Sequence, residues 1–396
     1  MKKISVIGIA LLVVVAVVRC GTEISHHSSS EKRQLRQGDL SDTERPPYSL
    51  HTLYLVNGTL TYLKRSATGT WTTQNVDPSR FVIQGAIDMF GQVAHVSYNS
   101  NSAGSTGVRY ANNATGAFQN TLSVSSSITN GFDENAIAVD NVGVVHIAHD
   151  AKPTLASQSQ RETYGSMNSW TNATTDVLTD PITTNAYFAG SSIHANNGKL
   201  IMHGHPKRSG SPLLVNIRNP LWYQSSVKIT TAGSAQCVGS AWGGEAKITK
   251  YAEGHSVYHC VATGIPQRTS IGYAHNESGQ WVTQSLASGP DVLPAPARPV
   301  TYMDNNDTLH LVYEQGGLKY QYRPRKGAWS AVVALPTISG VPSHVVAADS
   351  PSSVDILYVD NFTIKHLTNA SGSWVSKIVM TLTATPQLQK GMKITY

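Results

Sequence analysis

The chain is poor in charge, in cysteine and in long apolar runs. Asp, Glu, Lys and Arg make up only 14% of its 396 residues, and three cysteines occur. One long apolar run, from Ile7 to Val18, is too short to cross a bilayer as a helix, and no second run follows it. We therefore expect no integral membrane segment beyond the N-terminus.

The first 20 residues have the layout of a secretory signal peptide. Lys2 and Lys3 precede the apolar run, and small or polar residues follow it. We predict cleavage after Cys20 and a secreted mature chain. The alternative is a bacterial lipoprotein acylated at Cys20, which the preceding Val-Val-Arg disfavours because a charged residue stands where a small one is expected. Cleavage would remove Lys2, Lys3 and Arg19 and lower the net charge from +6 to +3. This is too little to indicate a nucleic-acid partner.

Short runs with alternating or β-branched apolar residues recur along the chain. They include VAHVSY, VVHIAH, TLHLVY and VDILYV, and Gly, Ser, Thr, Asn and Pro separate them about every ten residues. This pattern is typical of strands joined by turns, and no helical period is sustained. The sequence therefore predicts an all-β fold.

A turn followed by an aromatic residue repeats along the chain. The aromatic residues are Trp71, Phe118, Trp170, Trp222, Trp281, Trp329 and Trp374, at intervals of 47, 52, 52, 59, 48 and 45 residues. Each copy has room for four strands, which is the plan of a β-propeller blade. We predict a seven-bladed β-propeller over residues 49–396. The first copy lacks an opening strand, which TPQLQKGMKITY at the C-terminus would supply, leaving no open edge.

Two sets of residues keep their place within the copies. His95, His146, His259 and His310 lie in the second strand, and Asp88, Asp140 and Asp304 close the stretch before it. One histidine per blade would be spread around a ring, whereas metal ligands must converge on one point. We therefore expect these histidines to hydrogen-bond within their own blades, and we expect the repeated aromatic residues to pack rather than to stack on sugars. No metal site and no cofactor is predicted.

Cys237 and Cys260 remain after cleavage. They fall on the first and second strands of the fifth copy, which are neighbours in a blade, so we predict a disulfide if the chain passes through an oxidising compartment. The alternative is a pair of buried thiols.

Seven N-glycosylation sequons occur, at Asn57, Asn113, Asn172, Asn276, Asn306, Asn361 and Asn369. Three of them, NATG, NESG and NASG, also have a plain turn composition. Sequons alone are therefore weak evidence for glycans.

Catalytic motifs are missing. SATGTW lacks the Asp of the sialidase Asp-box, Ser-x-Asp-x-Gly-x-x-Trp, and no copy restores it. A glycosidase needs two carboxylates about 5 to 10 Å apart, and nothing in the sequence brings together the candidates Asp133, Glu134, Glu245 and Glu253. We assign no catalytic residue and expect no enzyme activity.

Residues 21–48 are polar and end in a double proline, which is typical of a disordered leader. Arg33, Gln34, Leu35 and Arg36 form an Arg-x-Leu-Arg motif there, and an acidic stretch leads to Asp42, Thr43, Glu44 and Arg45. This order resembles the leader of oomycete RxLR effectors, in which a dEER-type motif follows; here Thr43 replaces an acid. The resemblance covers only about the first 45 residues, and many family members have a helical fold that this chain does not share.

The resemblance implies a secreted pathogen effector that is delivered into host plant cells. The RQLR motif would then serve delivery or processing, and the propeller would bind a host protein and suppress defence or cell death. Binding of phosphatidylinositol 3-phosphate by the motif is not expected, because residues 31–45 have four basic and four acidic groups. The alternative is a secreted carbohydrate-binding lectin or glycosidase, with a glycan as partner.

Overall fold

The computed structural model describes residues 48–102, 105–128, 135–154, 157–166, 169–179, 188–206, 213–218, 227–229, 244–262, 268–289, 299–337 and 343–396. Every helix or strand element in these ranges is a β-strand, which confirms the prediction of an all-β chain. No helix in them is long and apolar enough to cross a membrane. The predicted signal peptide and all of the leader except Tyr48 lie outside the described residues.

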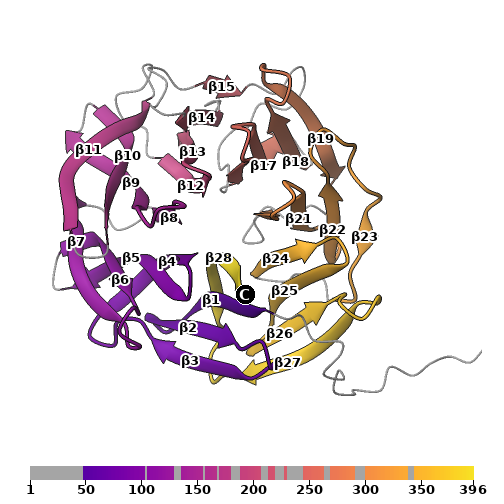
Figure 1. Cartoon of the computed structure of the whole chain (residues 1–396), viewed down its shortest axis with the longest axis horizontal. Coiled ribbons are helices and arrows are strands. Elements are labelled where there is room, and N and C mark those ends of the chain that lie inside the picture. Colours follow the sequence, from indigo (N-terminus) through magenta and orange to yellow (C-terminus); the bar gives the residue numbers. More distant parts are fainter. Residues whose placement is uncertain are drawn as a thin grey trace, which may run out of the picture. The chain divides into compact units, whose positions relative to one another are not determined.

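The strands form five four-stranded antiparallel sheets and one eight-stranded sheet (Figure 1). Only one residue pair, Lys390 with Ala86, links β28 to β4 in the larger sheet, which therefore divides into two four-stranded halves. We number the resulting four-stranded sheets as modules 1 to 7 in chain order.

Modules 1 to 3 have the following strands. Module 1 consists of β28 (Gln387–Thr395), β1 (Ser49–Val56), β2 (Thr59–Arg65) and β3 (Trp71–Asn75). Module 2 consists of β4 (Phe81–Phe90), β5 (Val93–Ser102), β6 (Ser105–Asn112) and β7 (Gln119–Ile128). Module 3 consists of β8 (Asn135–Val139), β9 (Val145–Thr154), β10 (Ser157–Ser166) and β11 (Ser169–Thr179).

Modules 4 to 7 repeat the same order. Module 4 consists of β12 (Phe188–Asn196), β13 (Lys199–Pro206), β14 (Leu213–Arg218) and β15 (Val227–Ile229). Module 5 consists of β16 (Glu245–Ile248), β17 (Gly254–Ala262), β18 (Arg268–His275) and β19 (Val282–Gly289). Module 6 consists of β20 (Val300–Met303), β21 (Leu309–Glu314), β22 (Leu318–Arg323) and β23 (Val333–Ala334). Module 7 consists of β24 (His344–Ser350), β25 (Ser353–Asp360), β26 (Thr363–Thr368) and β27 (Val375–Thr381).

The first strands of the modules contact one another in a cyclic order. β4 contacts β8, and contacts continue through β12, β16, β20, β24 and β28 back to β4. β28 also pairs antiparallel with β1, from Ser49 opposite Thr395 to Leu55 opposite Gln387. On its other side β28 lies close to β4, which Gly391 allows, because it has φ +93° and a Cβ there would lie 2.7 Å from the Ile87 carbonyl oxygen.

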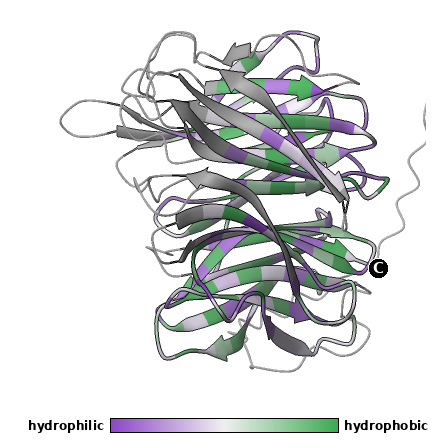
Figure 2. Ribbon diagram, turned by 90° about the vertical axis from the view of Figure 1, so that its left-hand side faces the viewer, coloured by the Kyte–Doolittle hydropathy of each residue, from purple (hydrophilic) through white to green (hydrophobic). Residues whose placement is uncertain are grey.

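The buried apolar side chains lie mainly between modules. Among the described residues they form seven clusters, each shared by two neighbouring modules, including modules 7 and 1. The second strands β1, β21 and β25 are almost wholly buried, whereas the outer strands β3 and β27 are largely exposed or half-buried. Figure 2 shows hydrophobic residues, in green, in strands throughout the modules. Each sheet therefore buries both faces against its neighbours.

Candidate functional site

The predicted histidines hydrogen-bond within their own modules at three of four positions. Nδ1 of His95 lies 2.6 Å from the Tyr110 hydroxyl, and Nδ1 of His310 lies 2.9 Å from that of Tyr320. Nδ1 of His146 instead donates to Glu162, at 2.6 Å. These contacts join the second and third strands of each module.

The prediction that His259 is equivalent to the other three histidines was wrong. His255, which pairs with Lys247 just as His95 pairs with Asp88, occupies the repeated position in module 5. Its Nδ1 lies 2.7 Å from the Tyr273 hydroxyl. The sequence GHSVYH offers two histidines four residues apart, and both lie on one face of the strand, so the pattern alone selected the wrong one.

The equivalence of the three aspartates was also partly wrong. The carboxylates of Asp140 and Asp304 each accept the backbone N–H groups two and four residues ahead, so they close a tight turn. Thr249 accepts the same two bonds in module 5. Asp88 lies two residues earlier in register, opposite His95, and accepts the backbone N–H of Val139 in the next module.

The repeated aromatic residues pack between modules, as predicted. Four of them lie at the edge of a ring on the third strand of the preceding module, and Trp281 packs against the apolar cluster shared by modules 4 and 5. The centroid distances are 5.4 Å for Phe118 with Tyr62, 5.1 Å for Trp329 with Tyr273, 5.4 Å for Trp374 with Tyr320, and 5.6 Å for Trp71 with His366. These rings are therefore not a set of equivalent sugar platforms.

Module 7 replaces the histidine of this repeat with a carboxylate. Asp355 accepts a 2.6 Å hydrogen bond from Nε2 of His366 and another from the Tyr48 hydroxyl, and Arg65 lies 3.5 Å away. Burial alone would raise the pKa of Asp355, but the hydrogen bond and charge of His366, with Arg65 and Tyr48, hold that pKa below its usual range. Because Tyr48 and Arg65 belong to the N-terminal side of module 1, we call this group the 7/1 cluster.

Carboxylates on the first strands also join modules. Glu245 accepts the backbone N–H of Thr301 in the next module at 2.7 Å, and Asp88 contacts Lys393 at 2.9 Å. Edge strands leave backbone donors without a partner strand, and these side chains supply the acceptors. Glu245 is therefore used structurally, and it belongs to a different network from Glu253. In the described ranges no group of three or more His, Cys, Asp or Glu could hold a metal ion.

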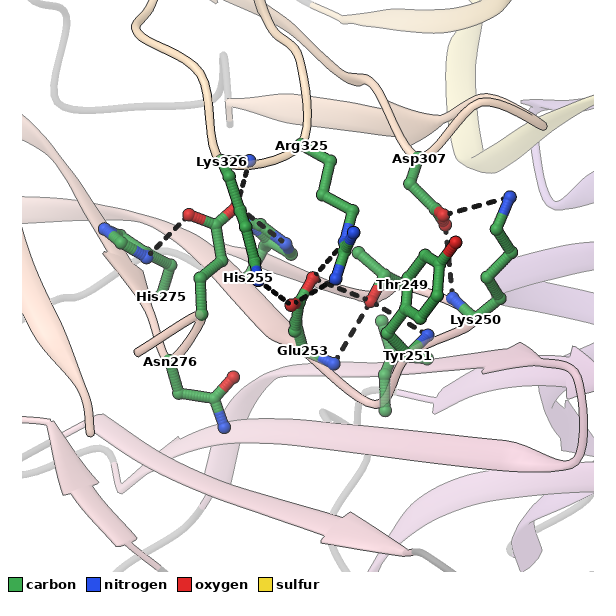
Figure 3. A network of polar contacts seen from close by, with 12 residues as sticks. Thr249, Lys250, Tyr251, Glu253, His255, His275, Asn276, Asp307, Arg325 and Lys326 are labelled. Carbon is green, nitrogen blue, oxygen red and sulfur yellow. Dashed lines mark hydrogen bonds and ion pairs between the residues drawn. The ribbon is translucent and has the colours of Figure 1, made fainter. Parts of the chain in front are cut away.

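A second charged group joins modules 5 and 6 and reaches the surface (Figure 3). Arg323 makes two bonds to Glu277, at 2.6 and 2.7 Å, and Arg325 makes two to Glu253, at the same two distances. We call this group the 5/6 network; it consists of Thr249, Lys250, Tyr251, Glu253, His275, Glu277, Asp307, Arg323, Arg325 and Lys326.

The outer part of the 5/6 network contains an exposed aromatic ring. Tyr251 is 55% exposed, and the guanidinium carbon of Arg325 lies 3.6 Å from its ring centre. Figure 3 shows Arg325 between Tyr251 and Glu253. Lys250 and Lys326 flank this group, with side chains that are 44% and 57% exposed. The turn Thr249–Glu253 fixes Tyr251, because Thr249 accepts the Tyr251 N–H.

The two glutamates of the 5/6 network stay ionised near neutral pH. Burial would raise the pKa of Glu277, but the hydrogen bonds from Arg323 and the Lys326 N–H lower it to about 2. Arg325 likewise lowers the pKa of Glu253 against the effect of burial. Neither group is therefore a proton donor at neutral pH.

Little in the sequence pattern pointed to this site. Glu253 was a candidate carboxylate, whereas Tyr251, Arg325 and Lys326 were not identified. One signal was present: in the repeated turn, Tyr251 holds the place of Val142 in DNVG and of Asn306 in DNND. A large aromatic side chain at an exposed turn position is one that a ligand or partner can reach.

The sequons divide into two groups. Oδ1 of Asn113, Asn276 and Asn369 accepts a backbone N–H of the second strand, from Ala94, Gly254 and Val354, at 2.7, 2.6 and 2.7 Å. Asn57, Asn306 and Asn361 are instead exposed. The side chain of Asn172 lies outside the described residues.

Several predicted residues lie outside the described ranges. They are the RQLR and DTER motifs, Cys237, Asp133 and Glu134. Cys260 lies on β17, opposite Ser270, but its side chain is not among those described. The disulfide therefore stays a prediction.

No family model and no curated protein matches the chain. Among solved structures it is similar to a protein from Lactobacillus plantarum, with 10% identity over 87% of this chain and 99% of that one and a TM-score of 0.54. It is also similar to the polysaccharide lyase Uly1, with 10% identity over 87% of each chain and a TM-score of 0.51. The six-bladed fungal lectin from Aleuria aurantia has 11% identity, covers 75% of this chain and 95% of its own, and gives a TM-score of 0.47.

At these identities the likeness concerns the fold. Four-stranded antiparallel modules follow one another in a cyclic order, and each buries its faces against its neighbours. The described residues between 48 and 396 have the fold of a β-propeller.

Proposed function

We propose that residues 49–396 form a closed seven-bladed propeller that binds a saccharide without cleaving it. Pairing of β28 with β1 supports closure, as does the 2.7 Å contact between Nε2 of His51 and the Thr395 hydroxyl. The core cluster shared by modules 7 and 1 supports a blade count of seven.

The outer part of the 5/6 network is the observation that supports saccharide binding. An exposed aromatic ring can pack against the C–H groups of a sugar, while fixed charged groups bind its hydroxyls. Tyr251 offers the ring, and Arg325 and Glu253 offer a guanidinium and a carboxylate beside it, already ordered by their mutual bonds. This order lowers the entropy that binding would cost.

The charges favour an acidic saccharide over a neutral one. Lys250, Arg323, Arg325 and Lys326 carry four positive charges, and Glu253, Glu277 and Asp307 carry three negative charges, which leaves a net charge of +1. The two most exposed of these side chains are both lysines. A sugar carboxylate or sulfate would therefore be attracted to the rim of the site.

Binding is favoured over catalysis because both glutamates are ionised and held by arginines. A glycosidase needs one carboxyl group that keeps its proton. Saccharide chemistry does occur among proteins of similar fold, since one of the solved structures is named as a polysaccharide lyase.

A glycan array followed by calorimetry tests this proposal. We expect binding of acidic saccharides and at least a tenfold loss of affinity in Tyr251→Ala, which corresponds to about 1.4 kcal/mol. Phe90→Ala is the matched control, because Phe90 is another exposed aromatic, at 39%, and should leave affinity unchanged. An array without a bound glycan, or equal losses in the two variants, would contradict the proposal.

The leader supports a second candidate, which concerns delivery and a different partner. We propose that the chain is an RxLR-type effector, secreted and then taken into host plant cells, where the propeller binds a host protein and suppresses defence. The observation that favours it is the order of three features along the chain: an apolar N-terminus, then Arg33 to Arg36, then Asp42 to Arg45.

Two assays in plants test the effector proposal. Residues 46–396 expressed inside plant cells should reduce cell death triggered by an elicitor. In infection assays, Arg33, Leu35 and Arg36 changed together to Ala should prevent delivery. Undiminished cell death would remove the suppressor role, and normal delivery of the triple variant would leave RQLR as part of a linker.

A further inference from the structure

Two exposed phenylalanines lie directly at two sequons. Phe362, which is 50% exposed, is the middle residue of the sequon Asn361-Phe362-Thr363. Phe81 is 60% exposed, and its ring covers Gly58, the middle residue of the sequon Asn57-Gly58-Thr59. A Cβ on Gly58 would lie only 2.2 Å from that ring. Each ring therefore offers apolar surface that a group attached to the neighbouring asparagine could cover.

The two asparagines occupy equivalent turns. Asn57 joins β1 to β2 and Asn361 joins β25 to β26, so both lie between the second and third strands, in modules 1 and 7. Both have positive φ, +49° and +55°, and both are exposed. Both side chains are therefore exposed in tight turns beside an exposed ring; Nδ2 of Asn361 donates to Oδ1 of Asp360 at 3.1 Å, on the surface.

The sequons at Asn113, Asn276 and Asn369 have a different role. Their amides accept a backbone N–H at 2.6 to 2.7 Å, and a glycine three residues on closes the same turn. Nδ2 of Asn369 also donates to the Pro351 carbonyl at 2.9 Å. In this group the pattern N-x-S/T-G is explained by turn chemistry: Oδ1 holds each amide against the second strand, and the side chain is half-buried, which leaves less room for a sugar on Nδ2 than at Asn57 and Asn361.

We propose that Asn57 and Asn361 are N-glycosylated, that the first sugar of each glycan packs on Phe81 and Phe362, and that Asn113, Asn276 and Asn369 stay unmodified. The C–H face of an N-acetylglucosamine covers apolar ring surface that water otherwise contacts. The proposal requires passage through a eukaryotic secretory route, but it does not depend on saccharide binding at the 5/6 network.

Secretion from a eukaryotic host and peptide mass spectrometry test the assignment. We expect glycans at Asn57 and Asn361 and none at the other three. Asn57→Gly and Asn361→Gly should each remove one glycan, and glycine accepts the positive φ of the turn. Thr115→Ala, Ser278→Ala and Ser371→Ala abolish the other three sequons while keeping the asparagines, and they should leave the mass of the glycans unchanged. A glycan on Asn113, Asn276 or Asn369, or none on Asn57 and Asn361, would overturn the proposal.

The packing of sugar on the rings has its own readout. Enzymatic deglycosylation should lower the Tm of the protein by about 1–2 °C. In Phe81→Ser with Phe362→Ser, which retains both sequons, deglycosylation should leave Tm unchanged. An equal drop in both proteins would show that the glycans do not pack on these rings.

Discussion

The junction between modules 7 and 1 and the junction between modules 5 and 6 contain the same type of ion pair, but the two pairs differ in their exposure to water. In each, the arginine that ends the third strand, Arg65 or Arg323, reaches a carboxylate of the preceding module. The four side chains of the 7/1 cluster are all nearly or fully buried, with Arg65 at 6% and Asp355 at 0% exposed. The 5/6 network instead extends outward to Tyr251, Lys250 and Lys326.

The difference separates a structural junction from one with access to ligands. A fully buried ion pair adds little to the free energy of unfolding while both partners are present. Removal of one partner lowers that free energy strongly, because the other charge stays buried and unpaired. An ion pair near water contributes little to stability but can exchange partners. The 7/1 cluster therefore fixes the joint between the two ends of the domain, while the 5/6 network leaves charged groups and a ring open to solvent.

Of the changes that separate the two junctions, removal of β28 should lower the stability of the domain most. A chain ending at residue 384 loses the buried side chains Leu388 and Met392 and the partner strand of β1. We expect loss of cooperative unfolding, because module 1 and the 7/1 cluster lose their support together. Thermal unfolding followed by circular dichroism measures this. A truncated protein with the Tm of the full domain would refute closure by β28.

Acid should be the next most damaging change. Burial lowers the pKa of His51 to about 3 and of His95, His255 and His259 to about 4. The unfolded chain takes up protons below about pH 6.5 while the folded chain does not, so stability is complete above pH 6.5 and falls down to about pH 4. Each unit of pKa shift corresponds to about 1.4 kcal/mol per histidine.

Urea unfolding at pH 7.5, 6 and 4.5 measures the acid effect. Below about pH 4, protonation of Asp355 should add to the loss, because its folded pKa is lowered. His259→Phe is a suitable control, since Nε2 of His259 is buried without a hydrogen-bond partner in the described structure. This variant should fold and show a shallower dependence on pH. Constant stability from pH 7.5 to 4.5 would contradict the buried neutral histidines.

Substitution within the 7/1 cluster should come third. Asp355→Ala leaves Arg65 buried without its counter-charge, and we expect a loss of about 3–5 kcal/mol in the free energy of unfolding. Urea unfolding at pH 7.5 gives this value. A loss below about 1 kcal/mol would mean that water reaches Arg65 and that the two junctions do not differ in access.

The matched substitution in the 5/6 network should have the smallest effect. Glu253→Gln keeps the shape of the side chain but removes its charge, and we expect about 0.5–1 kcal/mol because Arg325 can turn to water. Urea unfolding with and without 0.5 M salt, which shortens the Debye length to about 4 Å, should show a smaller difference between variant and parent at high salt. A loss as large as that of Asp355→Ala would show that the 5/6 network is structural.

The all-β architecture could be predicted because it depends on local patterns. The spacing of Trp71, Phe118 and Trp374 follows from a ring contact that modules 1, 2, 6 and 7 repeat. The error at His259 arose because its strand offers two histidines on one face, and only pairing with the adjacent strand decides between them. Asp88 was misaligned because module 2 has Phe90 at the turn position where modules 3 and 6 have aspartate. The 5/6 network was missed because Glu253 and Arg325 lie 72 residues apart and meet only through packing of two modules.

The joint of β28 with β1 also orders the events of synthesis. His51 and Thr395 are 344 residues apart in the chain and hydrogen-bond in the fold. As the chain emerges from the ribosome, module 1 is made first but lacks its first strand until the other modules have been translated. Leu50 and Leu53 then stay available to chaperones for the whole of that time.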